Sequence, residues 1–568
     1  MRTLRTSLLS ALLVAGCSSE SSNPSPANDS GTDTQSPGDT STSDSSNLDS
    51  TSSDAKVGDS PIGPSDASDQ SDASNESAAD SASDAASSAC KATTAQLSAL
   101  KAKVKHIVVI YQENWSYDSL WGLMPGTENA SRANPATITQ IRVDPTTGAP
   151  TTPYTSFPQP LIGPTLATAD PAFNGVTLTN QWYDLSPYHP GTGTTGDIVH
   201  RFWTNKAQVG SGATANTLMV AWSDNPGLVM SYYDGSTAPL GVIAKSYTVA
   251  DHFFQAAYGG SFLNHQFLIA AAPGTYGDTA ATNLVGDGHV IPGAVNDAGV
   301  QGRPVIQDTA VMHCTSGCAP AVDGKYYAVN TIQPVTPPNS GSAIVLPLQT
   351  NTTIGDRLED ATPAHTWAWF AGGWDYANGV ADAGEAGAPG NFQYHHQAFN
   401  YFSRWASGTE RTTHLKDETA LNAILADAVN ADANLPEVSF VKFYGDFNEH
   451  PGYATFLAGE QHAAALINTV LATTAVKDDT LIVLTYDEFG GRWDHVTPPV
   501  RDMWGPGTRI PAMVVGAMVK RGDGTTPAVD SCSYDTTAIL KLIEQRFGLA
   551  SITSVDGNQN DLATNIVP

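Results

Sequence analysis

The chain has 568 residues, of which 56 are acidic and 27 are basic, so its formal net charge is −29. This acidity argues against a nucleic-acid-binding protein, because such proteins present a basic surface to the phosphate backbone. No internal repeat is evident. Beyond the N-terminal segment, the sequence has no further apolar stretch of the length that spans a membrane.

Residues 1–17 have the features of a bacterial export signal. Arg2 and Arg5 precede an apolar run that is too short to span a bilayer. The run ends in Leu-Val-Ala-Gly-Cys17, which resembles a lipobox, so we expect Cys17 to be diacylated and to anchor the mature chain firmly. This predicts an exported, membrane-anchored lipoprotein, periplasmic or at the cell surface, and Ser18 is compatible with an outer membrane. The alternative is an ordinary secretory signal that contains a cysteine.

Residues 18–89 consist almost entirely of Ser, Asp, Ala, Thr, Gly and Pro, with no aromatic residue. Such a segment cannot bury enough apolar surface to offset the entropy lost on ordering. It carries roughly half of the net charge, and repulsion between like charges keeps it extended. We therefore predict a disordered tether between the membrane and a folded domain.

Residues 90–568 remain for that domain, a length that large α/β proteins reach with insertions. Apart from Cys17, it holds all the cysteines of the chain, namely Cys90, Cys314, Cys318 and Cys532. An even number in an exported protein favours disulfides. A local bridge between Cys314 and Cys318 would leave Cys90 for Cys532, but three pairings are possible. A zinc site at the Cys314–Cys318 pair is the alternative, although no second ligand pair of suitable spacing follows.

Two apolar, β-branched runs, residues 106–112 and 480–486, are typical of buried parallel strands. The first runs into Glu113 and Asn114, and the second into Asp487 and Glu488. Ligands collect at the carboxyl ends of such strands, and adjacent carboxylates repel each other unless a cation lies between them. The repeated design predicts a metal site built from both strand ends, whereas a single such end could be a solvated acidic turn.

The segment Glu-Asn-x-Ser-Tyr-Asp-x-x-x-Gly from Glu113 resembles the E-N-R-S-F-D-H-Y-F-G signature of the bacterial phosphoesterase family. The segment Asp-Glu-x-Gly-Gly-x-x-Asp-His-Val-x-Pro-Pro from Asp487 resembles its second signature. This family contains phosphatidylcholine-type phospholipases C and similar acid phosphatases, within the alkaline phosphatase superfamily. The resemblance spans roughly residues 100–550 and implies an α/β fold with a central, mostly parallel sheet flanked by helices, with loop-rich insertions. One departure is Trp115, where the family usually has Arg.

Ser261 is the predicted nucleophile. It follows Gly259 and Gly260, which permit a tight turn, and it opens an apolar stretch with helical potential. Free backbone N–H groups and the dipole at a helix N-terminus favour an anionic phosphate. The segment resembles the family's G-x-[ST]-x-x-N block, which implies that Ser261 is both the nucleophile and a metal ligand. A plain helix-capping serine is the alternative, and Asn264 and His265 are expected to support the turn.

Four histidines are candidates for contacts with the substrate. Asp197 is a suitable helix cap, so we expect His200 in the first turn of a helix. His395 and His396 resemble a pair that contacts phosphate in the acid phosphatase branch, and adjacent histidines reach one ligand only from a loop. His450 lies just beyond a predicted strand at 438–443. Either His450 or His200 is expected to protonate the leaving group.

The remaining chain contains an insertion and further core elements. Residues 275–350 are rich in Gly, Pro, Asn and Thr, which predicts loops and short strands that could form a lid. The core pattern returns in predicted strands at 366–370 and 510–515 and in predicted helices at 458–474 and 534–547.

Together these features predict a metal-dependent phosphoric ester hydrolase that acts through a phosphoserine intermediate. One divalent ion is expected, held by Glu113, Asn114, Ser261, Asp487 and Glu488. Oxygen ligands suit calcium, magnesium or manganese, and zinc is common in the superfamily.

A phosphomonoester is the favoured substrate, and a phospholipase C acting on phosphatidylcholine-type lipids is the alternative. A sulfatase would need a modified Cys or Ser in a C/S-x-P-x-R setting, which Cys314, Cys318 and Ser261 all lack. A non-catalytic surface lipoprotein on the same scaffold would be favoured by a lost metal ligand, and none is lost.

Overall fold

The computed structural model describes residues 90–134, 138–162, 168–277, 290–291, 305–306, 308–314, 318, 324–341, 344–380 and 391–568. The predicted signal at 1–17, with Cys17, and the predicted tether at 18–89 lie outside these residues, as does much of the predicted insertion. Within the described ranges, no helix combines the length and the apolarity needed to cross a membrane.

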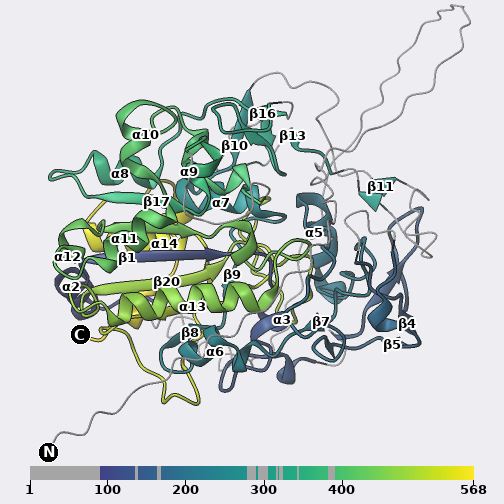
Figure 1. The fold of residues 1–568 in the computed structure, drawn as a ribbon. Helices are drawn as coiled ribbons and strands as arrows, with labels where there is room; N and C mark the ends of the chain where they lie inside the picture. The colour runs from purple at the N-terminus through teal and green to yellow at the C-terminus, as the bar shows by residue number, and fades with distance from the viewer. Residues whose placement is uncertain are drawn as a thin grey trace, which may run out of the picture. The chain divides into compact units, whose positions relative to one another are not determined.

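An eight-stranded sheet forms the centre of the described chain (Figure 1). In spatial order its strands are β18 (Leu415–Asp417), β17 (Trp367–Ala371), β19 (Val438–Lys442), β1 (His106–Gln112), β20 (Thr480–Tyr486), β21 (Ala512–Val515), β8 (Thr248–Ala250) and β22 (Ala528–Asp530). Neighbouring strands pair in parallel, except that β21 runs antiparallel to both β20 and β8. The predicted α/β fold with a mostly parallel central sheet is confirmed.

Strands β1 and β20 lie side by side in the middle of this sheet, and every residue of both is buried. A strand that is covered on both faces needs a continuous apolar run, which is what their sequences provide. In the register of the pair, Gln112 lies opposite Tyr486. The chain therefore leaves both strands at the same level, and the residues that follow, Glu113 and Asp487, emerge next to each other.

Helices cover both faces of the sheet; α11 and α13 lie in front of it in Figure 1 and α14 lies behind it. The helices are α2 (Thr94–Lys103), α3 (Tyr117–Trp121), α5 (Phe202–Val209), α6 (Pro239–Ala244), α7 (Ser261–Ala270), α8 (Ile354–Glu359), α9 (Trp374–Ala377), α10 (Gly408–His414), α11 (Glu418–Ala426), α12 (Ala431–Asn434), α13 (Phe456–Ala472), α14 (Ala538–Phe547) and α15 (Ser554–Gly557). The predicted helix at 534–547 begins only at Ala538, because Tyr534–Asp535 forms strand β23, which pairs with β9 (Phe253–Phe254).

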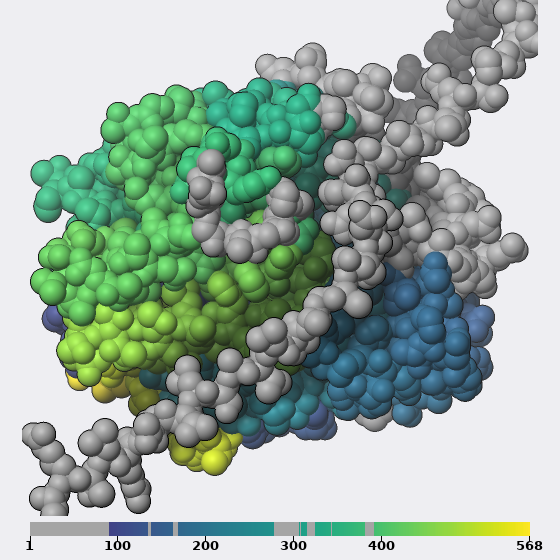
Figure 2. All heavy atoms as spheres, viewed as in Figure 1, coloured from purple at the N-terminus to yellow at the C-terminus, as the bar shows by residue number. Residues whose placement is uncertain are grey.

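Short strands make up the rest of the described regular structure. They are β2 (Ile141–Val143), β3 (Pro150–Pro153), β4 (Ser156–Phe157), β5 (Leu178–Thr179), β6 (Tyr183–Asp184), β7 (Ser231–Tyr232), β10 (Gly274–Gly277), β11 (Val290–Ile291), β12 (Val305–Ile306), β13 (Val311–His313), β14 (Tyr326–Ala328), β15 (Gln333–Pro334) and β16 (Val345–Leu346). In the space-filling view, the blue segment that carries β4 and β5 lies to one side of the green segments that follow α7 (Figure 2). The described part of 275–350 has the predicted short strands, and its role as a lid stays a prediction.

The prediction that a helix begins at Asp197 is wrong. Helix α5 begins at Phe202, so His200 precedes it in irregular chain. The Asp197 carboxylate accepts from the neighbouring N–H of Ile198, at 2.9 Å, and not from an N–H group of α5 among the described residues. The free N–H groups of the helix instead donate to side chains from more than a hundred residues later, with Phe202 N 2.9 Å from Asn330 Oδ1 and Thr204 N 2.8 Å from Asp308 Oδ2. Caps from so far along the chain leave no local sequence signal.

Two disulfides join the four cysteines of the folded chain. Cys90 is bonded to Cys532, with their Cα atoms 5.6 Å apart, and Cys314 is bonded to Cys318. Of the three possible pairings, this is the one that a local Cys314–Cys318 bridge leaves. The pair is therefore a disulfide, which excludes the alternative of a zinc site there.

Candidate active site

The ends of β1 and β20 bring four predicted metal ligands together. Glu113, Asn114, Asp487 and Glu488 are all fully buried. Asp487 Oδ1 accepts from the backbone N–H of Asn114 at 3.2 Å and from that of Glu488 at 2.8 Å. The two strand ends that lie 373 residues apart in sequence are thus hydrogen-bonded to each other at the site.

The segments after the two strands approach each other closely, and a glycine makes this possible. Asn114 adopts a positive φ of 62°, and Gly490 one of 61°. A Cβ atom at position 490 would lie 2.1 Å from the carbonyl oxygen of Asn114. Only glycine fits this contact and conformation without strain, which is the physical reason for a glycine after the Asp487–Glu488 pair.

Ser261 is the first residue of α7, as predicted, and it lies against the same strand end. Its hydroxyl lies 3.2 Å from Glu113 Oε2 and 3.4 Å from Asn114 Oδ1, and it can donate to either oxygen. The turn before it requires Gly259, which has a φ of 89° and whose Cβ would lie 2.6 Å from Phe202 N. Asn264 braces this turn, as expected: its Oδ1 accepts from Ala257 N and its Nδ2 donates to the carbonyl oxygen of Ala257.

Lys442, at the end of β19, is a site residue that the sequence analysis missed. It is fully buried, and its ammonium forms an ion pair with Glu113 Oε1. His396 Nε2 lies 2.9 Å from the same oxygen. Burial alone would raise the pKa of Glu113, but His396 and Lys442 outweigh it and hold that pKa well below its usual range. The available signal was a single lysine at the end of an otherwise uncharged, buried strand.

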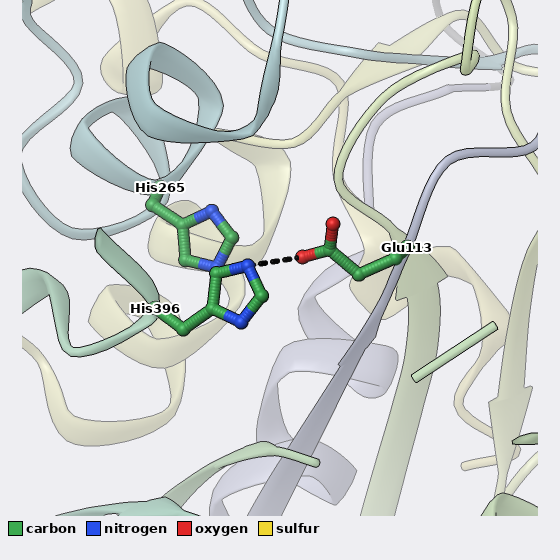
Figure 3. A group of neighbouring side chains, drawn as sticks. All are labelled: Glu113, His265 and His396. Atoms are coloured by element: carbon green, nitrogen blue, oxygen red, sulfur yellow. Dashed lines mark ion pairs between the residues drawn. The ribbon is translucent and has the colours of Figure 1, made fainter. Parts of the chain in front are cut away.

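His265 joins this group from the second turn of α7 (Figure 3). Its ring lies parallel to that of His396, with centroids 5.2 Å apart. Its Nδ1 lies 2.7 Å from the carbonyl oxygen of Ser261, while Nε2 has no hydrogen-bond partner among the described residues. Burial and the nearby charge of Lys442 lower the pKa of His265 well below its usual range. The side chain therefore faces the site as a neutral imidazole and does more than support the turn.

The predicted pair of adjacent histidines lies in a short 3₁₀ helix, η6 (Tyr394–His396). Its two rings are 4.4 Å apart at an interplanar angle of 75°, so they face different neighbours. His396 contacts Glu113, whereas the His395 ring packs edge-on toward His265 at 6.2 Å. Burial lowers the pKa of both histidines, to about 4 for His396.

His200 and His450 form a second, partly exposed group with Asp197, in which ligand-type atoms lie within 4.8 Å of one another. Nδ1 of His200 lies 2.5 Å from the carbonyl oxygen of Ile198, and Nδ1 of His450 contacts that of Pro451. Because a carbonyl can only accept, Nδ1 of each ring is the nitrogen that donates in these contacts. Nε2 of His200 is 3.8 Å from Glu488 Oε1, which connects this group to the buried carboxylates.

The carboxylates at the end of β20 lack a cation among the described residues at hydrogen-bond distance. Burial and the charge of Glu113 raise the pKa of Asp487 well above its usual range, and burial and the charge of Asp487 do the same for Glu488. Oε1 of Glu488 is buried and accepts no hydrogen bond from the part of the chain that the structure describes. An orphaned carboxylate oxygen in a set of oxygen donors is what a hard divalent cation requires, so these residues fit the predicted metal.

The same two sequence segments also build a second buried acidic cluster, from Asp118, Asp494 and His495. Here Arg509 fills the centre, with Nη2 2.9 Å from Asp118 and Nε 3.0 Å from Asp494. His495 Nδ1 lies 2.6 Å from Asp118 Oδ2. Cationic side chains of the protein therefore contact both carboxylates of this cluster.

Comparison with known proteins agrees with the two signatures. The model of the Phosphoesterase family matches residues 104–550. The chain belongs to this family. As a phosphoesterase it is an enzyme that hydrolyses phosphoric esters, and the family assignment made from the signatures is confirmed.

Relatives of this phosphoesterase include phospholipases C. It is 24% identical over 485 residues to phospholipase C A of Mycobacterium tuberculosis, which covers 78% of this chain and 73% of that protein. It is 22% identical over 483 residues to a non-hemolytic phospholipase C of Burkholderia pseudomallei, which covers 78% and 55% of the two chains. Among solved structures, it is similar to a protein in the alkaline phosphatase superfamily from Vibrio parahaemolyticus, with a TM-score of 0.30 and 8% identity over 66% of this chain and 72% of that one.

Proposed function

We propose that this enzyme is a metal-dependent phosphomonoesterase in which Ser261 is the nucleophile. The observation that carries the proposal is the position of the Ser261 hydroxyl, at the N-terminus of α7 and 3.2 Å from Glu113. The helix N-terminus favours an anionic phosphate in front of it. A nucleophile, an anion-binding helix end and a set of oxygen ligands therefore meet at one point.

One divalent ion would be held by Glu113, Asn114, Ser261, Asp487 and Glu488. Calcium, magnesium, manganese or zinc could take this place, with oxygen donors favouring the first three. When bound, such an ion lowers the pKa of a coordinated hydroxyl and offsets charge on the phosphoryl oxygens.

The first chemical step follows from the contacts of Ser261. Its hydroxyl can donate to Glu113, which stays ionised because His396 and Lys442 hold its pKa low. The hydroxyl proton passes to solvent as the Oγ–P bond forms. The bond from phosphorus to the ester oxygen breaks on the opposite side, and the alcohol departs with a proton. His396 and Lys442 hold Glu113 in place during this step, since both contact its other oxygen.

The proton for the departing alcohol is best assigned to His450. Burial lowers the pKa of His200, which favours its neutral form and suits it to accept a proton from the water of the second step. That water gives a proton to His200 as it attacks phosphorus, and the bond to Ser261 breaks. The Ser261 oxygen takes this proton from His200, phosphate leaves, and His450 regains its proton from solvent. The two imidazoles then have complementary roles, one as the acid of the first step and one as the base of the second.

Replacement of Ser261 tests this mechanism. Ser261→Ala should lose more than the roughly hundred- to thousandfold in rate that a single transition-state contact contributes, while Ser261→Thr should retain part of the activity because it keeps a hydroxyl. Ser407→Ala is a matched control, because Ser407 precedes α10 and makes no capping hydrogen bond. Near-normal turnover by Ser261→Ala would contradict the assignment.

A phospholipase C is the second candidate, and the names of the relatives favour it. The discriminating experiment compares hydrolysis of p-nitrophenyl phosphate with that of p-nitrophenyl phosphorylcholine. A preference for the first supports the phosphomonoesterase, and a preference for the second supports the phospholipase.

We also propose that Cys17 anchors the enzyme to a membrane, on the basis of the lipobox-like sequence before it. Cys17→Ser should release the protein from membrane fractions without changing its specific activity. Retention of this variant in the membrane fraction would contradict the anchor.

A further inference from the structure

A buried carboxylate lies directly behind the proposed active site. Glu449 is fully buried and has a positive φ of 75°, a conformation that costs energy in a residue with a side chain. Its Oε1 accepts from Gln112 Nε2 at 2.9 Å, and its Oε2 accepts from the Tyr486 hydroxyl at 2.8 Å. Glu449 therefore bridges the last residue of β1 and the last residue of β20.

Each member of this trio immediately precedes a proposed site residue. Gln112 precedes Glu113, Tyr486 precedes Asp487, and Glu449 itself precedes His450. Because Gln112 and Tyr486 are opposite each other in the sheet, the bridge of Glu449 spans one rung of the β1–β20 pair. A shift in this bridge would move all three following residues relative to one another.

Backbone contacts extend the same connection. The carbonyl of Asn448 accepts from Glu113 N at 3.0 Å, and that of Glu449 accepts from Trp115 Nε1 at 3.1 Å. The loop after β19 is thus held against both sides of Glu113. Trp115, the departure from the family signature, takes part in this connection.

Helix α13 packs closely against the Glu449 side chain at a glycine. Gly459 lies in α13, and a Cβ at that position would be 2.1 Å from Glu449 Cγ. A glycine within a helix destabilises the helix relative to alanine. The missing side chain at Gly459 leaves the space that the Glu449 side chain occupies.

We propose that Glu449 is a positioning residue that fixes the spacing of Glu113, Asp487 and His450 through its hydrogen bonds to Gln112 and Tyr486. This inference rests on the proposed function of those three residues. Glu449 itself does not touch the substrate, since its carboxylate is enclosed between the strand ends and α13. Misplacement of reacting groups by about 1 Å can cost about a hundredfold in rate, so such a residue affects turnover without taking part in the chemistry.

The test compares two replacements of Glu449. Glu449→Leu removes both hydrogen bonds and is expected to lower kcat by about 10- to 100-fold, as loss of an outer-shell partner does, with a smaller change in KM. Glu449→Gln keeps both contacts, because its amide oxygen accepts from Gln112 and its amide N–H donates to Tyr486. We expect it to retain most of the kcat of the wild type and the same affinity for divalent metal, measured by calorimetry.

Glu544 supplies a matched control. It is also a buried glutamate, in α14, and its Oε1 accepts from Ile552 N at 3.2 Å. Glu544→Leu should lower the melting temperature with little change in kcat. If it lowers kcat as much as Glu449→Leu does, general destabilisation is the cause and the positioning role is contradicted.

Tyr486→Phe tests the same positioning role if Glu449→Leu does not fold. It removes one hydrogen bond and should lower kcat severalfold while the melting temperature changes little. Unchanged kcat in Tyr486→Phe, or an equal loss in Glu449→Gln and Glu449→Leu, would overturn the proposal. Failure of the proposed function is distinguishable, because the wild-type enzyme itself would then show no label on Ser261 and no hydrolysis that depends on that residue.

Discussion

Two buried carboxylate clusters are built from the same two sequence segments, and they differ in how their charge is balanced. The first contains Glu113 with Asp487 and Glu488, and the second contains Asp118 with Asp494. In each, one carboxylate follows β1 and its partners follow β20.

The second cluster is saturated by the protein. Arg509 donates through Nε to Asp494, through Nη2 to Asp118, and through Nη1 to the carbonyl oxygens of Glu128 and Asp251. The planar fork of a guanidinium suits this arrangement, and His495 adds a further contact to Asp118. The cluster joins the two segments and is balanced by Arg509 and His495, although burial still raises the pKa of Asp494 to about 6.

The first cluster is only partly balanced. Lys442 and His396 both contact Glu113, so Asp487 and Glu488 are left with hydrogen bonds from backbone N–H groups and with raised pKa values. Burying a carboxylate without a nearby positive charge lowers the stability of the folded state, and a bound cation removes this cost. The comparison indicates that the cluster around Arg509 has a structural role. The cluster of Glu113, Asp487 and Glu488, whose negative charge is only partly balanced, is where we expect a metal ion and a phosphoryl group.

Asp487→Asn gives the largest expected effect. Activity should fall by more than the roughly 10- to 100-fold that loss of an outer-shell partner costs, because this residue is a proposed ligand. Bound divalent metal, measured by elemental analysis, should be lost as well. Asp432→Asn, at a half-exposed ion pair with Lys105, is the control. Full metal occupancy in Asp487→Asn would contradict the comparison.

Arg509→Met should act on stability instead. It leaves Asp118 and Asp494 buried without their cation, and breaking such a pair typically destabilises a protein by about 3–5 kcal/mol. Asp487→Asn, measured in the presence of a chelator, should be as stable as the wild type or more so, since it removes an uncompensated charge. Denaturant unfolding of both variants measures this contrast. Equal destabilisation by the two changes would show that the clusters do not differ in the way described.

His495→Gln should have the smallest effect, which is greatest below pH 6.5 and disappears as the pH rises through about 9. Burial alone would lower the pKa of His495, but the hydrogen bond and charge of Asp118 raise it from 6.5 to about 9. A raised pKa contributes stability that is fully present below pH 6.5 and is lost as the pH rises through about 9. The wild type should therefore lose stability across this window more steeply than His495→Gln, as melting temperatures at a series of pH values would show. Parallel curves would refute this.

The sequence was sufficient to predict the parts of the site that depend on local pattern. The apolar runs of β1 and β20 marked where Glu113 and Asp487 leave the sheet, and the paired glycines before Ser261 marked a turn into a helix. These signals lie within a few residues of the side chains concerned. The roles assigned to those residues remain predictions, whereas their proximity is a feature of the structure.

The remaining contacts depend on pairings between distant parts of the chain. Lys442 reaches Glu113 because β19 lies next to β1, and Arg509 reaches Asp118 across 391 residues of sequence. The start of α5 was misplaced for the same reason, since Asn330 caps it from far along the chain. The order of strands in the sheet cannot be predicted from the hydrophobic periodicity or the residue spacing near these positions.

The most direct test of the central claim is to find where phosphate becomes attached during turnover. The wild-type enzyme, supplied with a ³²P-labelled phosphomonoester and quenched in acid, should carry the label on the peptide that contains Ser261, and Ser261→Ala should carry none. Label on another residue, or its absence at every time point while the enzyme turns over, would contradict a nucleophilic Ser261 and would favour direct attack by water.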